Sequence, residues 1–342
     1  MKSATLGWSK LQTSILAFGT VTFGGPCFLG GLDQREAARL VDICRDNGVG
    51  LFDTADIYSD GVAEEMLGRA LGSSRKDVLI ATKAFGRTGP EPGAVGLSRR
   101  RLIEACEASL RRLGTDWIDL YQLHEFDALV PLEETLEALD RLVNAGKVRH
   151  VGCSNFCGWQ FMKALSLSER MGIKRFTSHQ IYYSLLGRDA EHDLLPAARD
   201  QDVGVLIWGP LASGFLSGKF LDEGKTTEGT RLSVLGPSDL YDPATAPAIV
   251  GAVREIAESR RVSLAQVAIN WLLRKPGITS VILGARNEQQ LRDNLAAGQW
   301  VLSGAEVARL DEVSRTRMPY PLWHQRSIYA AERNPAPPTY RP

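Results

Sequence analysis

The sequence predicts an α/β fold, a (β/α)8 TIM barrel with long loops after its strands. Eight short runs of apolar or β-branched residues recur along the 342 residues. Amphipathic helical patterns separate these runs, and this alternation indicates a parallel sheet covered by helices. Eight such units in one chain fit a closed barrel better than an open doubly wound sheet. No GxGxxG follows the first strands, because the Gly-rich run at 24–31 has the wrong spacing for that dinucleotide fingerprint.

The helical patterns carry start and stop signals. In the run from 98 to 114, Leu102, Cys106 and Leu110 share one face, with Ser98 as an N-cap and Gly114 as a C-terminal stop. Ser263 and Gln266 have the spacing of a capping box at the start of the last of these helices. The strands are predicted at 15–23, 50–54, 78–83, 118–124, 148–154, 177–183, 203–208 and 279–284, and the helices at 33–48, 62–72, 98–114, 132–146, 159–172, 190–202 and 263–277.

Three segments fall outside this repeating pattern. The residues on either side of Trp8 predict a small hairpin that closes the bottom of the barrel. Residues 218–247 and 316–342 are long and irregular, which is typical of lids and binding loops, and we expect the second to lie over the mouth as a C-terminal tail. No domain boundary appears, so residues 1–342 are expected to form a single barrel domain.

The composition narrows the function classes. A content of 44% hydrophobic and 23% charged residues is typical of a soluble globular protein. Forty basic and forty acidic residues cancel, so nucleic acid and membrane surfaces are not expected partners. The first ten residues contain no apolar h-region, which indicates a cytoplasmic protein. The five cysteines form no CxxC or His-rich zinc pattern, so we expect free thiols and no metal site.

Several predicted strands end in a polar side chain. Asp53, Lys83 and His124 end the second, third and fourth strands. Each alone has a structural explanation: an Asp at the start of a loop, a strand-end charge and a core histidine with satisfied hydrogen bonds. In a barrel, however, the carboxyl ends of all strands converge on one mouth, so we expect these groups to lie close together. The next three strands end in Ser154 and Asn155, in Gln180 and in Trp208.

Tyr58, five residues after Asp53, indicates which chemistry these groups can perform together. A phenol with an ordinary pKa of about 10 is a poor acid at neutral pH, and a nearby cation favours the phenolate. Lys83 can supply that cation while Asp53 holds it, and His124 can offer a hydrogen bond to a carbonyl oxygen. The sequence therefore predicts a proton-transfer site with Tyr58 as the donor. Asp56 is expected to be a loop or helix-start residue without a catalytic part.

With these residues the chain resembles the aldo-keto reductase family, from about Ser9 to Leu310. The resemblance implies a TIM barrel that binds NADPH and reduces aldehydes or ketones by reversible hydride transfer. It places the catalytic tetrad on Asp53, Tyr58, Lys83 and His124, with Tyr58 as the general acid. The motifs that carry it are FDTADIY (52–58), ATKAFG (81–86), DLYQLHEFD (119–127), GKVRHVGCSNF (146–156), HQIYYSLL (179–186), WGPLASGFLSGKF (208–220) and ILGARNEQQLRDNL (282–295).

The resemblance also implies cofactor contacts. Arg286 is expected to read the 2′-phosphate of NADPH, because a guanidinium forks onto phosphate oxygens. Gln290 stands where the best-known branch has an arginine, so NADH remains an alternative. Arg231 is either a second basic contact or a solvated loop charge. The implied positions are Gly19, Thr20, Val21, Asp53, Ser154, Asn155, Gln180 and Trp208 near the nicotinamide, Pro210, Leu211, Ala212, Ser213, Gly214 and Lys219 near the pyrophosphate, and Gly284, Arg286, Gln290, Asp293 and Asn294 near the adenosine.

A second hypothesis follows from the branch that this chain resembles, which contains potassium-channel β subunits and bacterial reductases. It is a cofactor-binding regulatory or partner subunit with little turnover. Channel β subunits characteristically have Asn in place of the tetrad histidine, so His124 favours an ordinary enzyme. Hydrolysis or isomerisation ranks last, because no nucleophile with an adjacent base stands out.

The substrate and the oligomeric state stay open. Aromatic walls suit apolar, cyclic and sugar carbonyls alike, and helix faces of a barrel can pair as a homo-oligomer in many ways. The residues expected to line the mouth are Phe23, Phe85 and Phe126, with Tyr183, Trp323 and Tyr329 as further candidates.

Overall fold

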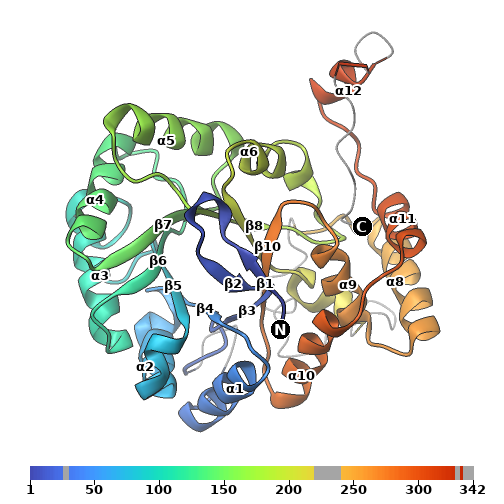
Figure 1. The fold of residues 1–342 in the computed structure, drawn as a ribbon, viewed down its shortest axis with the longest axis horizontal. Helices are drawn as coiled ribbons and strands as arrows, with labels where there is room; N and C mark the ends of the chain where they lie inside the picture. The colour runs from blue at the N-terminus through green and yellow to red at the C-terminus, as the bar shows by residue number, and fades with distance from the viewer. Residues whose placement is uncertain (26–30, 219–239, 328–331, 334–342) are drawn as a thin grey trace.

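The computed structural model describes residues 1–25, 31–218, 240–327 and 332–333. Eight parallel strands close into a barrel in the order β10-β3-β4-β5-β6-β7-β8-β9 (Figure 1), as the sequence predicts. The strands are β3 Leu16–Gly19, β4 Leu51–Asp53, β5 Leu79–Ala84, β6 Ile118–Leu123, β7 Val148–Ser154, β8 Ser178–Tyr182, β9 Gly204–Trp208 and β10 Ile278–Leu283.

Helices surround the barrel on all sides in Figure 1. They are α1 Gln34–Asp46, α2 Val62–Leu71, α3 Arg99–Leu113, α4 Leu132–Asn144, α5 Gly158–Met171, α6 Leu194–Asp200, α8 Ala246–Arg260, α9 Leu264–Leu273, α10 Glu288–Ala296, α11 Gly304–Val313 and α12 Leu322–Gln325. Short 3-10 turns lie in the segments between strands and helices: η1 Gly7–Ser9, η2 Tyr58–Gly61, η3 Gly72–Asp77, η4 Pro92–Ala94, η5 Asp189–Glu191, η6 Ala212–Ser217 and η7 Ala297–Gln299.

The helix ends follow the sequence signals, with one difference. In α3 the Ser98 hydroxyl accepts from the Arg101 amide, and Gly114 ends the helix at a φ of 62°. In α9 the Ser263 hydroxyl caps the amide of Gln266, but the Gln266 side chain does not complete a capping box. Its amide group instead donates to Asp293 of α10, 2.6 Å away. The second half of the box is therefore replaced by a contact between two helices.

Two apolar clusters hold the barrel together. The larger one fills the layer between strands and helices, and it includes Phe18, Phe52 and Tyr121. The smaller one lies inside the barrel, because side chains alternate between the two faces of each strand. It consists of Leu6, Ala17, Leu51, Ala81, Leu120, Leu206 and Ile282.

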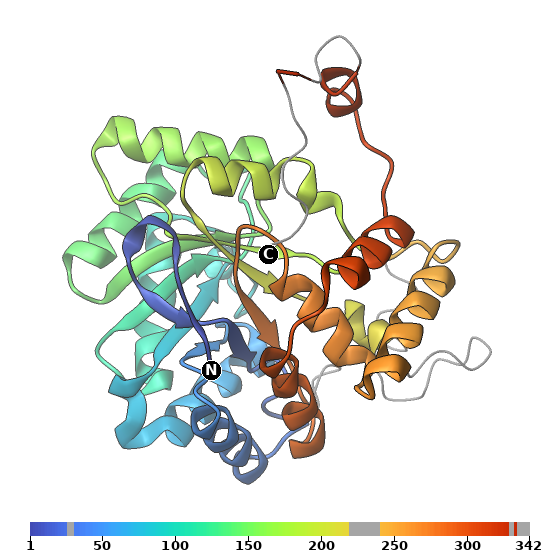
Figure 2. The same ribbon diagram turned by 45° about the vertical axis from the view of Figure 1, so that its right-hand side comes forward.

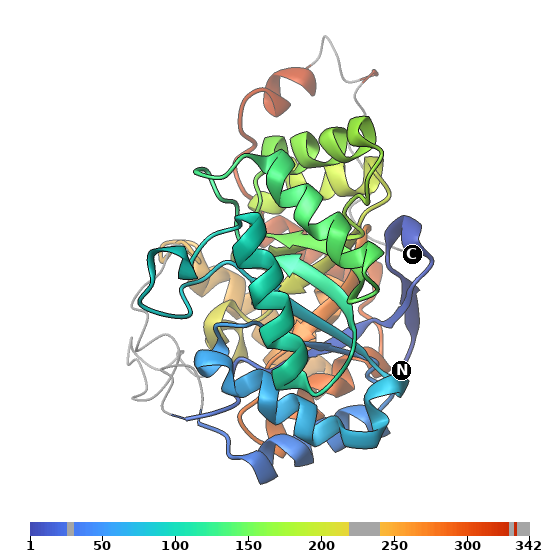
Figure 3. The same cartoon turned by 90° about the vertical axis from the view of Figure 1, so that its left-hand side faces the viewer.

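An N-terminal hairpin closes one end of the barrel, which confirms the prediction around Trp8 (Figures 1 and 3). Its strands, β1 Ser3–Thr5 and β2 Gln12–Ser14, pair antiparallel. Between them, Leu6 is 1% exposed and joins the interior cluster. The Trp8 indole donates to the Phe176 carbonyl, 3.0 Å away, just before β8. The hairpin therefore covers the end of the barrel opposite to the end at which the predicted site residues lie.

The tail differs from its expected position over the mouth. Its described part, with α12, projects away from the barrel (Figures 1 and 2), and Tyr320 and Trp323 are 75% and 52% exposed. Trp323 therefore lies on an exposed arm instead of the mouth. Residues 26–30, 219–239, 328–331 and 334–342 lie outside the described residues, and with them the expectations for Lys219, Arg231 and Tyr329. Among the helices that the structure describes, none has the length and apolar character needed to span a membrane.

Candidate active site

A buried lysine lies at the centre of the site. Asp53 ends β4, and Lys83 lies next to the end of the neighbouring strand β5. Lys83 Nζ donates to Asp53 Oδ1 at 2.5 Å and to the Thr54 carbonyl at 2.8 Å. The same nitrogen lies 3.3 Å from the Tyr58 hydroxyl. The Lys83 side chain is 0% exposed, so its charge acts on Asp53 and Tyr58 with little screening by water.

The surroundings keep Lys83 protonated. Burial lowers the pKa of Lys83, but attraction to Asp53 and to the Tyr58 oxygen more than offsets this effect, so the pKa of Lys83 lies above its usual value. The second oxygen of Asp53 accepts from Gln180 Nε2 at 2.8 Å and from Gln122 Nε2 at 3.4 Å. The sequence reasoning missed Gln122. A buried glutamine in the apolar run 118–124 was the available signal.

His124 meets the phenol from the next strand. It follows β6, and its ring lies edge-on to Tyr58 with 5.9 Å between centroids and an interplanar angle of 76°. Burial, followed by repulsion from the Lys83 ammonium, lowers the pKa of His124 to about 3. The imidazole is therefore neutral at pH 7 and has one N–H to donate. The structure thus brings together the four predicted residues Asp53, Tyr58, Lys83 and His124.

Tyr58 begins a tight turn with an uncommon backbone. Ser59, Asp60 and Gly61 have φ values of 49°, 53° and 93°. Left-handed conformations of non-glycine residues cost free energy and persist where the surroundings hold them. The Ser59 hydroxyl donates to the Phe23 carbonyl at 2.6 Å. A Cβ on Gly61 would lie 2.7 Å from the Arg112 side chain, so this position accepts only glycine without rearrangement.

The arrangement of a phenol beside a buried ammonium, with a neutral imidazole facing the phenol, suits proton transfer to a carbonyl oxygen. The family model described as "Aldo/keto reductase family" matches residues 15–315, which include all eight barrel strands. The chain belongs to the aldo/keto reductase family.

Relatives of this aldo/keto reductase have both enzyme and channel-subunit names. The chain is 36% identical over 324 residues to "Uncharacterized oxidoreductase YrpG" of Bacillus subtilis, covering 92% of this chain and 96% of the relative. It is 32% identical over 333 residues to "Versiconal hemiacetal acetate reductase" of Aspergillus parasiticus, covering 91% and 96%. It is 35% identical over 305 residues to "Probable voltage-gated potassium channel subunit beta" of Arabidopsis thaliana, covering 87% and 91%. The oxidoreductase relatives support a reductase of carbonyl compounds.

Among the residues predicted to lie near the nicotinamide, two have buried hydroxyl groups without a hydrogen-bond partner in the described structure. The oxygens of Ser154 and Thr20 are buried and make no hydrogen bond within the described residues. Buried hydroxyl groups normally have a partner, so a polar ligand fits there. Asn155, at a φ of 56°, donates to the His124 carbonyl and accepts from the Trp208 indole at 2.9 Å. Asn155 therefore links the Trp208 indole to the backbone of His124.

Other positions on this side have structural partners. The side-chain amide of Gln180 donates a hydrogen bond to Asp53, as described above. In this structure Gln180 therefore helps to hold Asp53 in place. Gly19 ends β3, and a Cβ there would lie 2.9 Å from Ile282. Val21 is partly buried two residues further on. Gly19 therefore allows β3 to approach β10 closely.

The residues predicted to lie near the pyrophosphate form a glycine-containing turn. After β9, the 3-10 turn η6 includes Ser213 and Gly214 with φ values of 56° and 96°, and Ala212 has a φ of 45°. The Leu211 carbonyl accepts from the amides of Gly214 and Leu216, which closes the turn. Pro210 is buried beside it. Backbone N–H groups left exposed in turns can bind anions.

The residues predicted to lie near the adenosine surround the start of α10. Arg286 is exposed just before α10, which Asn287 caps. The Gln290 side chain accepts from the Arg286 amide at 3.0 Å, and the Asn294 side chain donates to the Gly284 carbonyl at 3.2 Å. Asp293 is held by Gln266 of α9. Arg286 is exposed beside the start of α10, and it remains the predicted phosphate contact of this set.

The expected substrate contacts fall into different environments. Phe23 is 0% exposed and packs on Phe18 with 5.9 Å between ring centroids, so the structure places it in the core instead of the mouth. Phe85 is partly buried after β5. Phe126, two residues after His124, lies edge-on to Phe156 at 5.3 Å and is also partly exposed. Phe85 and Phe126 remain predicted substrate contacts.

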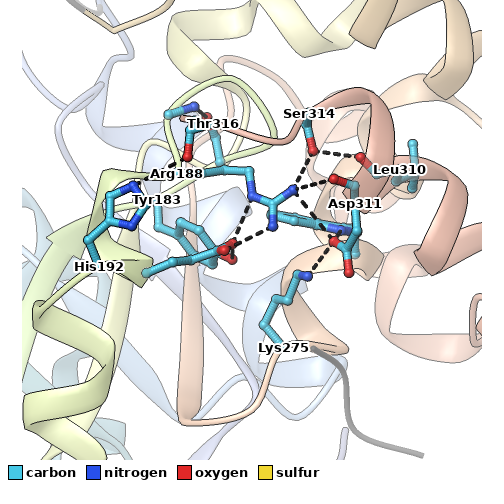
Figure 4. Close-up of polar contacts among 12 residues, drawn as sticks. Tyr183, Arg188, His192, Lys275, Leu310, Asp311, Ser314 and Thr316 are labelled. Atoms are coloured by element: carbon cyan, nitrogen blue, oxygen red, sulfur yellow. Dashed lines mark hydrogen bonds and ion pairs between the residues drawn. The ribbon is translucent and has the colours of Figure 1, made fainter. Parts of the chain in front are cut away.

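Tyr183 also lies in the core, in a buried polar network (Figure 4). Its hydroxyl donates to Glu191 at 2.5 Å, and Arg188 holds the same carboxylate through two nitrogens at 2.8 and 2.9 Å. Arg188 also donates to the Asp311 carbonyl at 2.9 Å and to the Ser314 hydroxyl at 2.8 Å. This network fixes α11 to the segment after β8 and has no contact with the tetrad among these bonds.

Proposed function

We propose that this aldo/keto reductase is an NADPH-dependent enzyme that transfers a hydride to the carbonyl of an aldehyde or ketone, and catalyses the reverse oxidation of an alcohol. The observation that carries the proposal is the Lys83 ammonium, buried between Asp53 and the Tyr58 hydroxyl. Tyr58 is the general acid in this proposal.

The side chains have separate roles. NADPH, when bound, supplies the hydride that reaches the carbonyl carbon. Tyr58 donates its hydroxyl proton to the carbonyl oxygen, and the Lys83 ammonium stabilises the phenolate that remains. Asp53 holds Lys83 in place. The neutral His124 donates its N–H to the same carbonyl oxygen, which favours the negative charge that develops there.

The proposed cofactor contacts follow from the fit described above. Ser154 and Asn155 would hold the nicotinamide end, the turn after β9 would hold the pyrophosphate, and Arg286 would pair with a 2′-phosphate. We propose NADPH over NADH because the positive charge of Arg286 can pair with the 2′-phosphate, which NADH lacks. If Arg286 does not pair with a 2′-phosphate, NADH is the alternative cofactor.

The test is NADPH oxidation by the purified protein, followed at 340 nm, with aldehydes, sugars and cyclic and polycyclic ketones, repeated with NADH. We expect turnover with at least one activated carbonyl. Tyr58→Phe should lower kcat by about 10²- to 10⁴-fold, the range for removal of a general acid, with unchanged NADPH binding. Near-normal turnover by Tyr58→Phe contradicts the proposed mechanism.

A second candidate is a cofactor-binding subunit of a larger assembly with little turnover. The relatives named as potassium-channel β subunits favour it. It predicts tight NADPH binding without consumption over the whole carbonyl panel, together with co-purification of a partner. His124 favours the reductase, because channel β subunits characteristically have Asn in place of the tetrad histidine.

A further inference from the structure

One buried guanidinium connects the two segments that carry Tyr58 and Lys83. Arg101 Nη2, from the first turn of α3, lies 2.7 Å from Asp56 Oδ2 and 3.2 Å from the Gly86 carbonyl. The Arg101 and Asp56 side chains are 6% and 1% exposed. Asp56 belongs to the loop after β4, and Gly86 to the loop after β5. The same nitrogen therefore reaches both loops from the helix layer.

The two loops are also in direct contact with each other. The Asp56 amide donates to the Lys83 carbonyl at 3.0 Å, and the Tyr58 amide donates to the Ala55 carbonyl at 3.1 Å. A Cβ on Gly86 would lie 2.3 Å from the Ile57 side chain, so the loops touch without space between them. A shift of Asp56 would move Tyr58, two residues further on.

Stability alone gives little reason for this ion pair. Burial raises the pKa of Asp56 to about 6, although Arg101 acts to lower it, so the carboxylate is poorly compensated for its lost water. One Asp56 oxygen and the Arg101 Nε are buried without a hydrogen bond in the described part of the chain. Such pairs contribute little to stability relative to apolar residues of similar volume, whereas they fix geometry in some proteins.

We infer that Arg101 is a positioning residue for the proposed reaction: by holding Asp56 and the Gly86 carbonyl together, it keeps the Tyr58 hydroxyl beside the Lys83 ammonium. Arg101 touches neither the phenol nor the ammonium, and it acts through the two loops. The inference rests on the proposed function, since that function gives Tyr58 and Lys83 their chemical roles.

The test is a double-mutant cycle between Arg101→Met and Tyr58→Phe. We expect Arg101→Met to lower kcat by about 10- to 100-fold, because small misplacements of reacting groups have effects of this size. KM for the carbonyl and Kd for NADPH should change by less than about threefold, since their binding residues are untouched. In the Tyr58→Phe background, Arg101→Met should lower the residual rate by less than about twofold, because the positioned group is already absent.

Two outcomes of this cycle overturn the inference. One is an equal proportional loss in both backgrounds, which is the result for a residue that only keeps a fraction of the protein folded. The other is no loss of kcat in Arg101→Met. Arg99→Met is the matched control, because Arg99 lies on the same helix and pairs with Glu137, with 38% and 42% of the two side chains exposed. It should leave kcat unchanged.

Asp56→Asn tests the same link from its other end if Arg101→Met fails to fold. It keeps the shape of the side chain and weakens the attraction to Arg101, so the same pattern of kcat losses is expected. A wild-type protein that turns over no carbonyl contradicts the proposed function, and hydrogen exchange then decides on Arg101. Arg101→Met should accelerate exchange in residues 54–61 and Arg99→Met should not, whereas unchanged exchange overturns the inference.

Discussion

The Lys83 ammonium lies 2.5 Å from Asp53 Oδ1, and neither side chain is more than 4% exposed. A pair buried to this degree couples stability to chemistry, because each charge depends on the other to compensate for its lost water.

Lys83→Met should therefore reduce both properties. We expect the free energy of unfolding to fall by about 3–5 kcal/mol, because Asp53 is left as an unpaired buried charge. We also expect kcat to fall by at least about 100-fold, because the phenolate loses its cation. Urea unfolding and steady-state kinetics measure the two effects. The double variant Lys83→Met with Asp53→Asn should recover much of the stability and none of the activity, and recovered activity would contradict the role given to Lys83.

His124 should make the protein less stable in acid. Its pKa is lowered to about 3 in the folded chain, whereas an unfolded histidine titrates near 6.5, so the unfolded state binds more protons between these values. Below about pH 6 this effect should lower the free energy of unfolding by about 1.4 kcal/mol per pH unit. Unfolding curves at pH 7 and pH 5 should show a smaller pH dependence for His124→Asn than for the wild type. His324→Asn, at an exposed position, is the control, and equal pH dependence of wild type and His124→Asn would contradict the assignment.

Arg286 should determine the choice of nucleotide. Arg286→Ala is expected to raise Kd for NADPH by about 10- to 100-fold, the size of a lost charged hydrogen bond, and to leave Kd for NADH unchanged. Fluorescence titration of the protein with each nucleotide measures both constants. Arg292→Ala, on the adjacent helix α10, is the control, because the Arg292 guanidinium pairs with Glu288 at 2.8 Å. If Arg286→Ala raised Kd for both nucleotides equally, Arg286 would instead contact the part of the cofactor that NADPH and NADH share.

Arg188 should matter for stability and not for catalysis. Arg188→Met removes the ion-pair partner of Glu191, which keeps only the Tyr183 hydroxyl, and it removes the donor to the Asp311 carbonyl. The expected loss is about 3–5 kcal/mol of unfolding free energy. Thermal or urea unfolding measures it, and kcat of the folded fraction should be unchanged. Arg260→Met is the comparison, because Arg260 makes an equally close pair with Glu306 on the surface, where the effect should be much smaller.

Much of the fold follows from periodicity. Six of the eight barrel strands lie within their predicted runs, and β5 and β10 each extend one residue beyond theirs. Eight apolar runs separated by amphipathic helices leave few other arrangements. The tetrad positions follow from the same reasoning, since strand ends in a barrel share one mouth. Contacts made across helices do not follow from it. The pairing of Asp56 with Arg101 joins residues 45 apart in the chain, and no spacing rule predicts it.

The core positions of Phe23 and Tyr183, two of the three aromatic residues that lie away from the expected mouth, have a physical reason. Neighbouring residues of a strand face opposite sides of the sheet. An error of one position therefore moves a side chain from the inside of the barrel to the layer between strands and helices, or the reverse. Tyr182 lies against Trp208 with 5.0 Å between ring centroids, whereas Tyr183 lies against Trp271 of α9. Phe23 follows the end of β3, where alternation no longer applies, and its packing on Phe18 depends on the path of the loop.

The closure of the barrel has a consequence for the growing chain during synthesis. β3 pairs with β10, so Phe18 meets Leu283 across nearly the whole sequence. Until β10 has left the ribosome, β3, the first barrel strand, has no partner on one side. The backbone N–H and C=O groups of that open edge can then pair with other chains. Contacts between such distant residues also form slowly. The last strand to be synthesised is therefore the one that removes the risk of aggregation.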